Sequence, residues 1–138
     1  MASRVLFLCT NNAARSQMAE GLLRHLGGNR FEAQSAGTAP TRVHPLAIAV
    51  MQEIGIDISG QRSKDIGETD PGIETAITLC DQAKEACPIL PGAVRYLHWD
   101  LPDPAAVPGD ETAQIAAFRE VRDALAARIH GFIEGAEA

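Results

Sequence analysis

The feature that most constrains this chain is an apolar run near its N-terminus that leads directly into a cysteine. Val5 to Leu8 is continuously apolar, as expected of a strand buried on both faces. From Ala13 onward, apolar residues recur every three or four positions, which predicts a helix. Cys9 therefore lies at the end of a strand, and a short loop carries the chain into a helix N-terminus. Backbone N–H groups and the positive end of the helix dipole converge there, so we expect an anion-binding junction that favours a thiolate.

Strand-like and helical patterns alternate along the rest of the chain. Further strands are predicted at 31–36, 76–79 and 94–99. Helices are predicted at 45–54, with the apolar face Leu46, Ala49, Val50 and Ile54, and at 115–132, with the apolar face Ile115, Phe118, Val121, Leu125, Ile129 and Phe132. Loops are predicted at 59–74, which has room for one helical turn, and at 100–110. This alternation predicts one α/β domain spanning residues 1–138, with a parallel sheet flanked by helices on both faces. Ligands of such sheets bind beyond the carboxyl ends of the strands, where Cys9, Cys80 and the acidic loop after Trp99 can converge.

Composition restricts the partners of such a domain. The 138 residues are 46% hydrophobic, enough for a sizeable core, and the net charge of −6 argues against nucleic acid or an anionic membrane surface as a partner. No stretch is long enough to span a bilayer, and the N-terminus lacks a signal-peptide pattern, so we expect a cytoplasmic protein. Three cysteines in that compartment favour catalytic or redox roles. The four histidines show no metal-binding spacing, so no catalytic metal is expected.

The loop after Cys9 carries side chains suited to an oxyanion. Arg15 presents a planar fork of donors, and Ser16 can donate a hydrogen bond to a thiolate. Asn12 tolerates the left-handed backbone that turns loop amides inward. The predicted oxyanion-binding residues are Thr10, Asn11, Asn12, Ala13, Ala14, Arg15 and Ser16.

At these residues the sequence resembles the low-molecular-weight protein tyrosine phosphatase superfamily, and within it the thioredoxin-coupled arsenate reductases. The resemblance covers nearly the whole chain and implies a four-stranded parallel sheet flanked by helices. Its matching segments are Cys9 with Asn12, Arg15 and Ser16, the stretch from Arg15 to Gly21, Ser35 to Gly37, Thr78 to Cys80, Cys87 to Pro91, His98-Trp99 and Asp103-Pro104.

The resemblance also implies a three-cysteine reaction. The Cys9 thiolate attacks arsenate, and Asp103 protonates the departing oxygen; Asp100 competes for that role, but the rigid Asp-Pro turn favours Asp103. Cys80 then attacks the sulfur of Cys9 and arsenite leaves, after which Cys87 attacks Cys80 and thioredoxin reduces the Cys80–Cys87 bond. A monomer that needs no cofactor beyond this external reductant is expected.

The spacing of the second and third cysteines places a condition on that reaction. Cys87 lies seven positions after Cys80, which in a helix is about 10 Å along the axis. Disulfide formation tolerates Cα atoms only up to about 7 Å apart. If residues 80–87 are helical, the segment must therefore unwind, and its polar composition makes melting easy.

The sequence departs from the family pattern in two places. Asn11 and Ala13 stand where the reductases commonly have Gly and Ser, which we expect to alter the rate and not the chemistry. Some reductases bind potassium behind the loop through residues that match Asn12, Glu20 and Ser35, plus an aspartate whose position is Lys64 here. Our hypothesis is that the Lys64 ammonium replaces this ion, pairing with Glu20 and steadying Asn12; the alternative is a solvated loop lysine.

Two other functions remain open from the sequence. A phosphatase acting on phosphotyrosine or another phosphomonoester would use the same loop, although Ala105 stands where such enzymes typically offer a tyrosine, and Tyr96 is predicted within a strand. A sensor that binds arsenite through three cysteines would have no need of Arg15 and Ser16.

Overall fold

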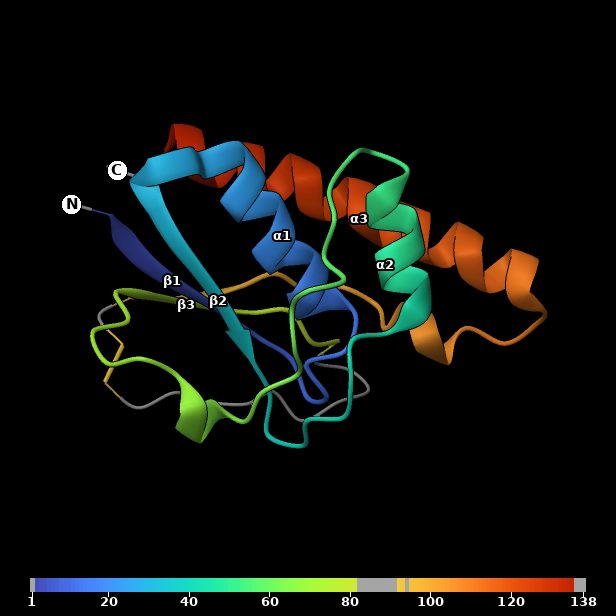
Figure 1. Ribbon diagram of the computed structural model, residues 1–138, viewed down its shortest axis with the longest axis horizontal. Coiled ribbons are helices and arrows are strands. Elements are labelled where there is room, and N and C mark those ends of the chain that lie inside the picture. The colour runs from blue at the N-terminus through green and yellow to red at the C-terminus, as the bar shows by residue number, and fades with distance from the viewer. Residues whose placement is uncertain (1, 82–91, 94, 136–138) are drawn as a thin grey trace.

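The computed structural model describes residues 2–81, 92–93 and 95–135, and their fold is a four-stranded parallel sheet covered by helices (Figure 1). The strands are β1 (Ser3–Leu8), β2 (Phe31–Ala36), β3 (Thr75–Thr78) and β4 (Arg95–His98), in the order β2-β1-β3-β4. The α-helices are α1 (Arg15–Gly27), α2 (Pro45–Gln52) and α3 (Glu111–Glu134), and short 3₁₀ helices occur at η1 (Gly28–Arg30), η2 (Ile66–Glu68) and η3 (Pro104–Ala106). The predicted α/β class and parallel sheet are confirmed.

The two faces of the sheet are covered differently in the described part of the chain. Val5 and Phe7 of β1 pack in one apolar cluster with residues from all three α-helices. Leu6 and Leu8 point to the opposite face, where they form a smaller cluster that Ile66 of η2 packs against. Because β1 is buried on both sides, its apolar run is continuous and not alternating.

The register of the sheet aligns the ends of its central strands. Leu8 pairs with Thr78, and Thr78 pairs with His98, so β1, β3 and β4 end side by side. Cys9 directly follows β1, and Cys80 lies two residues beyond β3. Both cysteines are therefore delivered to the same edge of the sheet, as the sequence predicted.

Helix α3 matches its predicted apolar face, whereas the prediction for α2 is wrong in part. Phe118, Val121, Leu125 and Ile129 of α3 are buried, and Ile115 and Phe132 pack partly buried against the core. In α2, Leu46 is partly buried and Val50 is buried, but Ala49 and Ile54 are exposed, and the helix ends at Gln52. The buried residues of α2 are Ala47, Val50 and Met51. Seven of its eight residues are apolar or Pro (PLAIAVMQ), so periodicity could not select the face that packs on α1 and α3.

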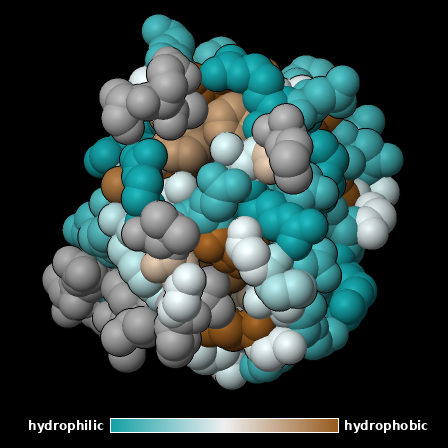
Figure 2. All heavy atoms as spheres, turned by 90° about the vertical axis from the view of Figure 1, so that its left-hand side faces the viewer, coloured by the Kyte–Doolittle hydropathy of each residue, from teal (hydrophilic) through white to brown (hydrophobic). Residues whose placement is uncertain are grey.

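Among the described residues, no helix has the length and apolar character to cross a bilayer. Figure 2 shows the face nearest the chain termini, on which hydrophilic residues dominate and apolar ones show in small, separate patches. Over all the described residues, the exposed large hydrophobic side chains are Ile54 and Tyr96.

Candidate active site

The loop from Cys9 to Ala14 is held from one side by the segment 39–44. Ala39 N–H donates to the Thr10 carbonyl at 2.9 Å, and His44 N–H donates to the Ala13 carbonyl at 2.9 Å. Within a peptide unit the C=O and N–H groups point in opposite directions. Because the carbonyls of Thr10 and Ala13 point toward segment 39–44, the N–H groups of Asn11 and Ala14 point away from that segment. Asn11 and Ala14 both line the site pocket.

Two backbone features allow this loop conformation. Asn12 has φ 49°, in the left-handed region, as its residue type predicted. Gly37 follows β2 and lies directly against the loop, because a Cβ there would collide with the carbonyl oxygens of Thr10 and Cys9. The sequence Ser35-Ala36-Gly37 therefore contributes a close backbone approach that no larger residue permits.

Cys9 is a buried free thiol at the centre of the site. Its Sγ lies 2.8 Å from Ser16 Oγ, and that hydroxyl accepts a hydrogen bond from Asn12 Nδ2 at 2.8 Å. The Ser16 hydroxyl therefore lies between the Asn12 amide and the Cys9 sulfur and is hydrogen-bonded to both.

Arg15 joins the ends of two chain segments beside this thiol. The residue is buried, and its Nη1 donates to the Leu79 carbonyl at 3.2 Å and to the Leu101 carbonyl at 3.1 Å. The first carbonyl belongs to the residue before Cys80, and the second to the loop that carries Asp103. The guanidinium therefore holds both segments against the anion loop.

Asp103 shares a pocket with the nucleophile, whereas Asp100 is not among the residues that line it. The pocket is lined by Cys9, Asn11, Ala13, Ala14, Arg15, Asp103 and Ala105. Asp103 Oδ1 accepts from Ala105 N–H at 3.0 Å, which caps η3 and fixes the carboxylate. The exposed Asp100 instead has Oδ1 3.4 Å from His98 Nε2. Of the two aspartates, Asp103 is therefore the one that lines the pocket together with Cys9.

Cys80 is fully buried and disulfide-bonded. It follows β3, whose last residue, Thr78, has Oγ1 2.7 Å from His98 Nδ1 on β4. Cys87 lies outside the described residues, and so does most of the segment 80–87 whose helical character was considered above.

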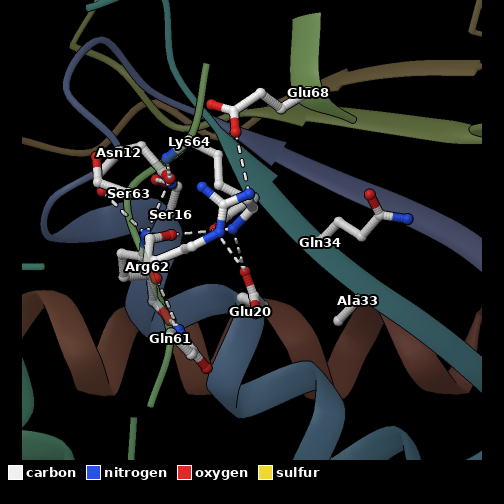
Figure 3. A network of polar contacts seen from close by, with 12 residues as sticks. Asn12, Ser16, Glu20, Ala33, Gln34, Gln61, Arg62, Ser63, Lys64 and Glu68 are labelled. Carbon is white, nitrogen blue, oxygen red and sulfur yellow. Dashed lines mark hydrogen bonds and ion pairs between the residues drawn. The ribbon is translucent and has the colours of Figure 1, made fainter. Parts of the chain in front are cut away.

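Behind the loop, Glu20 is the centre of a buried polar network. Figure 3 shows Asn12, Ser16, Glu20, Gln61 and Lys64 gathered between α1 and the segment 61–65. Ser35 Oγ donates to Glu20 Oε1 at 2.5 Å, and Lys64 Nζ lies 3.7 Å from the same oxygen. The backbone N–H of Lys64 donates to Asn12 Oδ1 at 2.8 Å. Lys64 thus contacts Glu20 through its side chain and Asn12 through its main chain.

Sequence reasoning missed three members of this network. Arg24 Nη2 lies 2.5 Å from Glu20 Oε2, and Gln17 Nε2 donates to Asn12 Oδ1 at 2.9 Å. Gln61 Nε2 in turn donates to Gln17 Oε1 at 2.8 Å. The spacing of Glu20 and Arg24, four residues apart on a predicted helix, was the one local signal available.

His44 was also missed, although it connects the loop to two helices. Its Nδ1 accepts from Leu46 N–H at 3.1 Å and caps α2, and its ring lies 4.8 Å from that of Phe118 on α3. Burial lowers the pKa of the His44 imidazole, against an opposing effect of Asp103, and Arg42 lowers it further. The ring is therefore neutral at pH 7, with its proton on Nε2 because Nδ1 is an acceptor.

No cluster of three or more His, Cys, Asp or Glu side chains suited to a metal ion occurs in the described ranges. The arrangement beside β1 is a buried thiol hydrogen-bonded to a serine, an arginine, a half-buried aspartate and a loop whose amides turn toward the pocket. Such a site can bind a tetrahedral oxyanion, attack it with sulfur and protonate a leaving oxygen.

Comparison with known proteins agrees with this chemistry. The model of the low molecular weight phosphotyrosine protein phosphatase family matches residues 4–137, and the chain belongs to this family. An arsenate reductase of Bacillus licheniformis is 42% identical to it over 96% of each chain. Among solved structures, an arsenate reductase in the oxidized state matches with a TM-score of 0.81 and 34% identity, over 96% of this chain and 98% of that one. A thioredoxin-dependent arsenate reductase of Corynebacterium glutamicum matches with a TM-score of 0.72 and 30% identity, over 97% of this chain and 61% of that one.

Proposed function

We propose that this protein reduces arsenate to arsenite through a relay of three thiols, with thioredoxin as the final reductant. The observation that carries the proposal is the placement of Cys80 at the end of β3, beside the strand that delivers Cys9. A phosphatase needs only one thiol, the nucleophile, whereas a reductase needs a second thiol within reach of it. The arsenate reductases that resemble the chain over nearly its whole length support the same assignment.

The first step forms a bond between sulfur and arsenic. Loop N–H groups and Arg15 bind the arsenate oxygens, and the Cys9 thiolate attacks the arsenic. Asp103 gives its proton to one arsenate oxygen, which leaves as water. The product is an arsenic(V) thioester on Cys9.

The second step moves two electrons from the thiols to arsenic, and the third passes the resulting disulfide to Cys80 and Cys87. The Cys80 thiolate attacks Cys9 Sγ, the sulfur–arsenic bond breaks, and its electron pair leaves with arsenic as arsenite. Cys87 then attacks Cys80, which releases the Cys9 thiolate and leaves a Cys80–Cys87 disulfide that the thioredoxin dithiol reduces. A disulfide at Cys80 together with a free Cys9 is the arrangement that the third step leaves behind.

We also propose that Lys64 takes the place of the potassium ion that related enzymes hold behind the loop. The residues present do not fit such an ion, because Glu20 already has Arg24 and Lys64 as cationic neighbours. The Lys64 side chain is 17% exposed, so its ammonium is not fully solvated. No metal or other cofactor is required by this proposal.

A phosphatase is the second candidate, because phosphate and arsenate have nearly the same shape and the family is named for phosphatases. Ala105 lines the site pocket, and Tyr96 is exposed on β4. None of the described residues that line the pocket offers an aromatic ring to a phenyl phosphate. An arsenite sensor is less well supported, since it has no use for Arg15 and Asp103 beside the thiol.

The proposal is tested by arsenate-dependent NADPH oxidation in the presence of thioredoxin and thioredoxin reductase. Native protein is expected to turn over many times, Cys9→Ser to be inactive, and Cys87→Ser to stop after at most one turnover. Brisk hydrolysis of an aryl phosphate without arsenate turnover would instead assign a phosphatase, and tight retention of arsenite without turnover a sensor. We expect a cytoplasmic monomer, which fractionation of the source cells and size-exclusion chromatography will check.

A further inference from the structure

A continuous chain of side-chain hydrogen bonds begins at Arg24, near the C-terminal end of α1. It ends at the Cys9 thiol, beside the N-terminal end of the same helix. We propose that Arg24 is a positioning residue whose charge sets the direction of this chain, so that Cys9 receives a proton donor. The proposal depends on the proposed function only in taking Cys9 as the nucleophile.

The outer half of the chain has a forced orientation. Arg24 Nη1 donates to Gln61 Oε1 at 3.1 Å. A guanidinium has donors and no acceptor, so the oxygen of the Gln61 amide must face Arg24. The amide nitrogen of Gln61 then faces Gln17, and it donates to Oε1 of that residue at 2.8 Å and to its carbonyl at 3.0 Å.

The inner half continues in the same direction. Gln17 Nε2 donates to Asn12 Oδ1 at 2.9 Å, and Asn12 Nδ2 donates to Ser16 Oγ at 2.8 Å. Ser16 Oγ lies 2.8 Å from Cys9 Sγ, within hydrogen-bond distance of the sulfur. Every link from Arg24 to Ser16 therefore donates toward Cys9, and the chain begins at a positive charge.

Burial makes this direction matter. Asn12, Ser16 and Gln17 have no exposed surface, so water cannot replace a missing donor. Hydrogen bonds in such a row polarise one another, and one reversed amide brings like groups face to face. Without the guanidinium, the Gln61 amide is oriented only by its own donation to Gln17, and the polarisation of each following group weakens.

Arg24 starts this chain and Lys64 does not. The Lys64 ammonium contacts Glu20 and the Arg62 carbonyl, and its contact with Asn12 is through the backbone N–H, which every residue but Pro supplies. Arg24 binds Glu20 Oε2 with Nη2 and leaves Nη1 for Gln61. The two Nη groups of one guanidinium thus bind Glu20 and Gln61 at the same time. The single ammonium of a lysine does not offer two separate donor groups.

The test measures Cys9 ionisation separately from arsenate chemistry. In a Cys80→Ser, Cys87→Ser background, Cys9 is the remaining thiol, and its rate of alkylation by iodoacetamide reports the thiolate. Arg24→Met is expected to lower the rate at pH 6 about fivefold, the equivalent of one hydrogen bond, and to leave the rate at pH 9 unchanged. Arg24→Lys, which supplies one donor group in place of two, is expected to lose less.

Arg4→Met is the matched control, because Arg4 pairs with Glu32 at 2.8 Å on the far end of β1 and is expected to change neither rate. Equal rates for Arg24→Met and native protein at pH 6 overturn the proposal, as does an equal loss at both pH values, which indicates altered access. If Arg24→Met does not fold, the Glu20→Gln, Arg24→Met double variant removes the orphaned carboxylate and is measured against Glu20→Gln. The alkylation rates of Cys9 are measured without arsenate, so they do not depend on whether the protein reduces arsenate. The proposed function and the role of Arg24 can therefore be refuted independently.

Discussion

Two glutamates in this protein each bind a pair of cationic side chains, and they differ in what surrounds them. Glu20 is 4% exposed and lies between Arg24 and Lys64, directly behind the anion loop. Glu53 is exposed at the C-terminal end of α2, where it contacts Arg119 at 2.6 Å and Arg122 at 2.8 Å. The first cluster is connected to Cys9 through hydrogen bonds, and the second joins α2 to α3.

The comparison indicates that burial and connectivity decide what an ion cluster does. Hydrogen bonds from Arg119 and Arg122 lower the pKa of Glu53 to about 2, yet the Glu53 carboxylate is exposed to water and none of its contacts with the described residues reaches the site pocket. Glu20 also accepts a hydrogen bond from Ser35 and cannot exchange its partners for water. We therefore expect changes at Glu20 to affect both activity and stability, and changes at Glu53 to affect stability alone.

The largest effect is expected from Glu20→Gln. The variant keeps the shape of the side chain but removes the charge that holds Arg24 and Lys64. It is expected to lose about 2 kcal/mol of unfolding free energy in urea and at least tenfold in arsenate turnover, because the loop support is disturbed. Unchanged turnover in a destabilised variant would show that the cluster is structural, like that of Glu53.

Arg122→Met is the corresponding break in the second cluster. Arg122 is largely buried, and its Nη1 donates to the Val50 carbonyl at 2.9 Å as well as to Glu53. Loss of these bonds is expected to lower the unfolding free energy by about 1–2 kcal/mol and to leave arsenate turnover at the native value. Arg119→Met is the control and should lose less stability, since Arg119 is exposed. A loss of turnover in Arg122→Met would contradict the division between the clusters.

The pH dependence of stability should show the contribution of the exposed Glu53 cluster. Because the pKa of Glu53 is about 2 in the folded protein and near 4.5 as a free side chain, its contribution is complete above pH 4.5 and lost as pH falls toward 2. Glu53→Gln should therefore melt below native protein at pH 6, and the difference in Tm should shrink between pH 4.5 and 2. A difference in Tm that stays constant across this range would exclude the ion pair as its cause.

The smallest effect on arsenate turnover is expected when potassium is added to the native protein. If Lys64 supplies the cation behind the loop, replacing choline chloride by potassium chloride at equal ionic strength leaves native turnover unchanged. Lys64→Gln should lose much of that turnover in both salts, with Arg62→Gln as a surface control. Strong stimulation of the native protein by potassium would refute the role of Lys64.

The sequence was sufficient for the sheet and the anion loop because both depend on local patterns. The apolar run of β1, the Cys9–Arg15 spacing and the Asp103-Pro104 turn are each contained within a few residues. It was not sufficient for the outer part of the support network, where Arg24 reaches Gln61 across 37 positions and Gln61 reaches Gln17 across 44. The same reason hid the Glu53–Arg119 pair, which spans 66 positions, since tertiary packing alone brings such side chains together.

The central claim is that the thiols of this chain supply the two electrons that reduce arsenate, and a single turnover without thioredoxin tests it most directly. Fully reduced protein is mixed anaerobically with one equivalent of arsenate, then quenched with an alkylating agent and analysed by mass spectrometry. The account predicts one arsenite per protein, a Cys80–Cys87 disulfide and an alkylated Cys9. Three alkylated cysteines with no arsenite formed would contradict it.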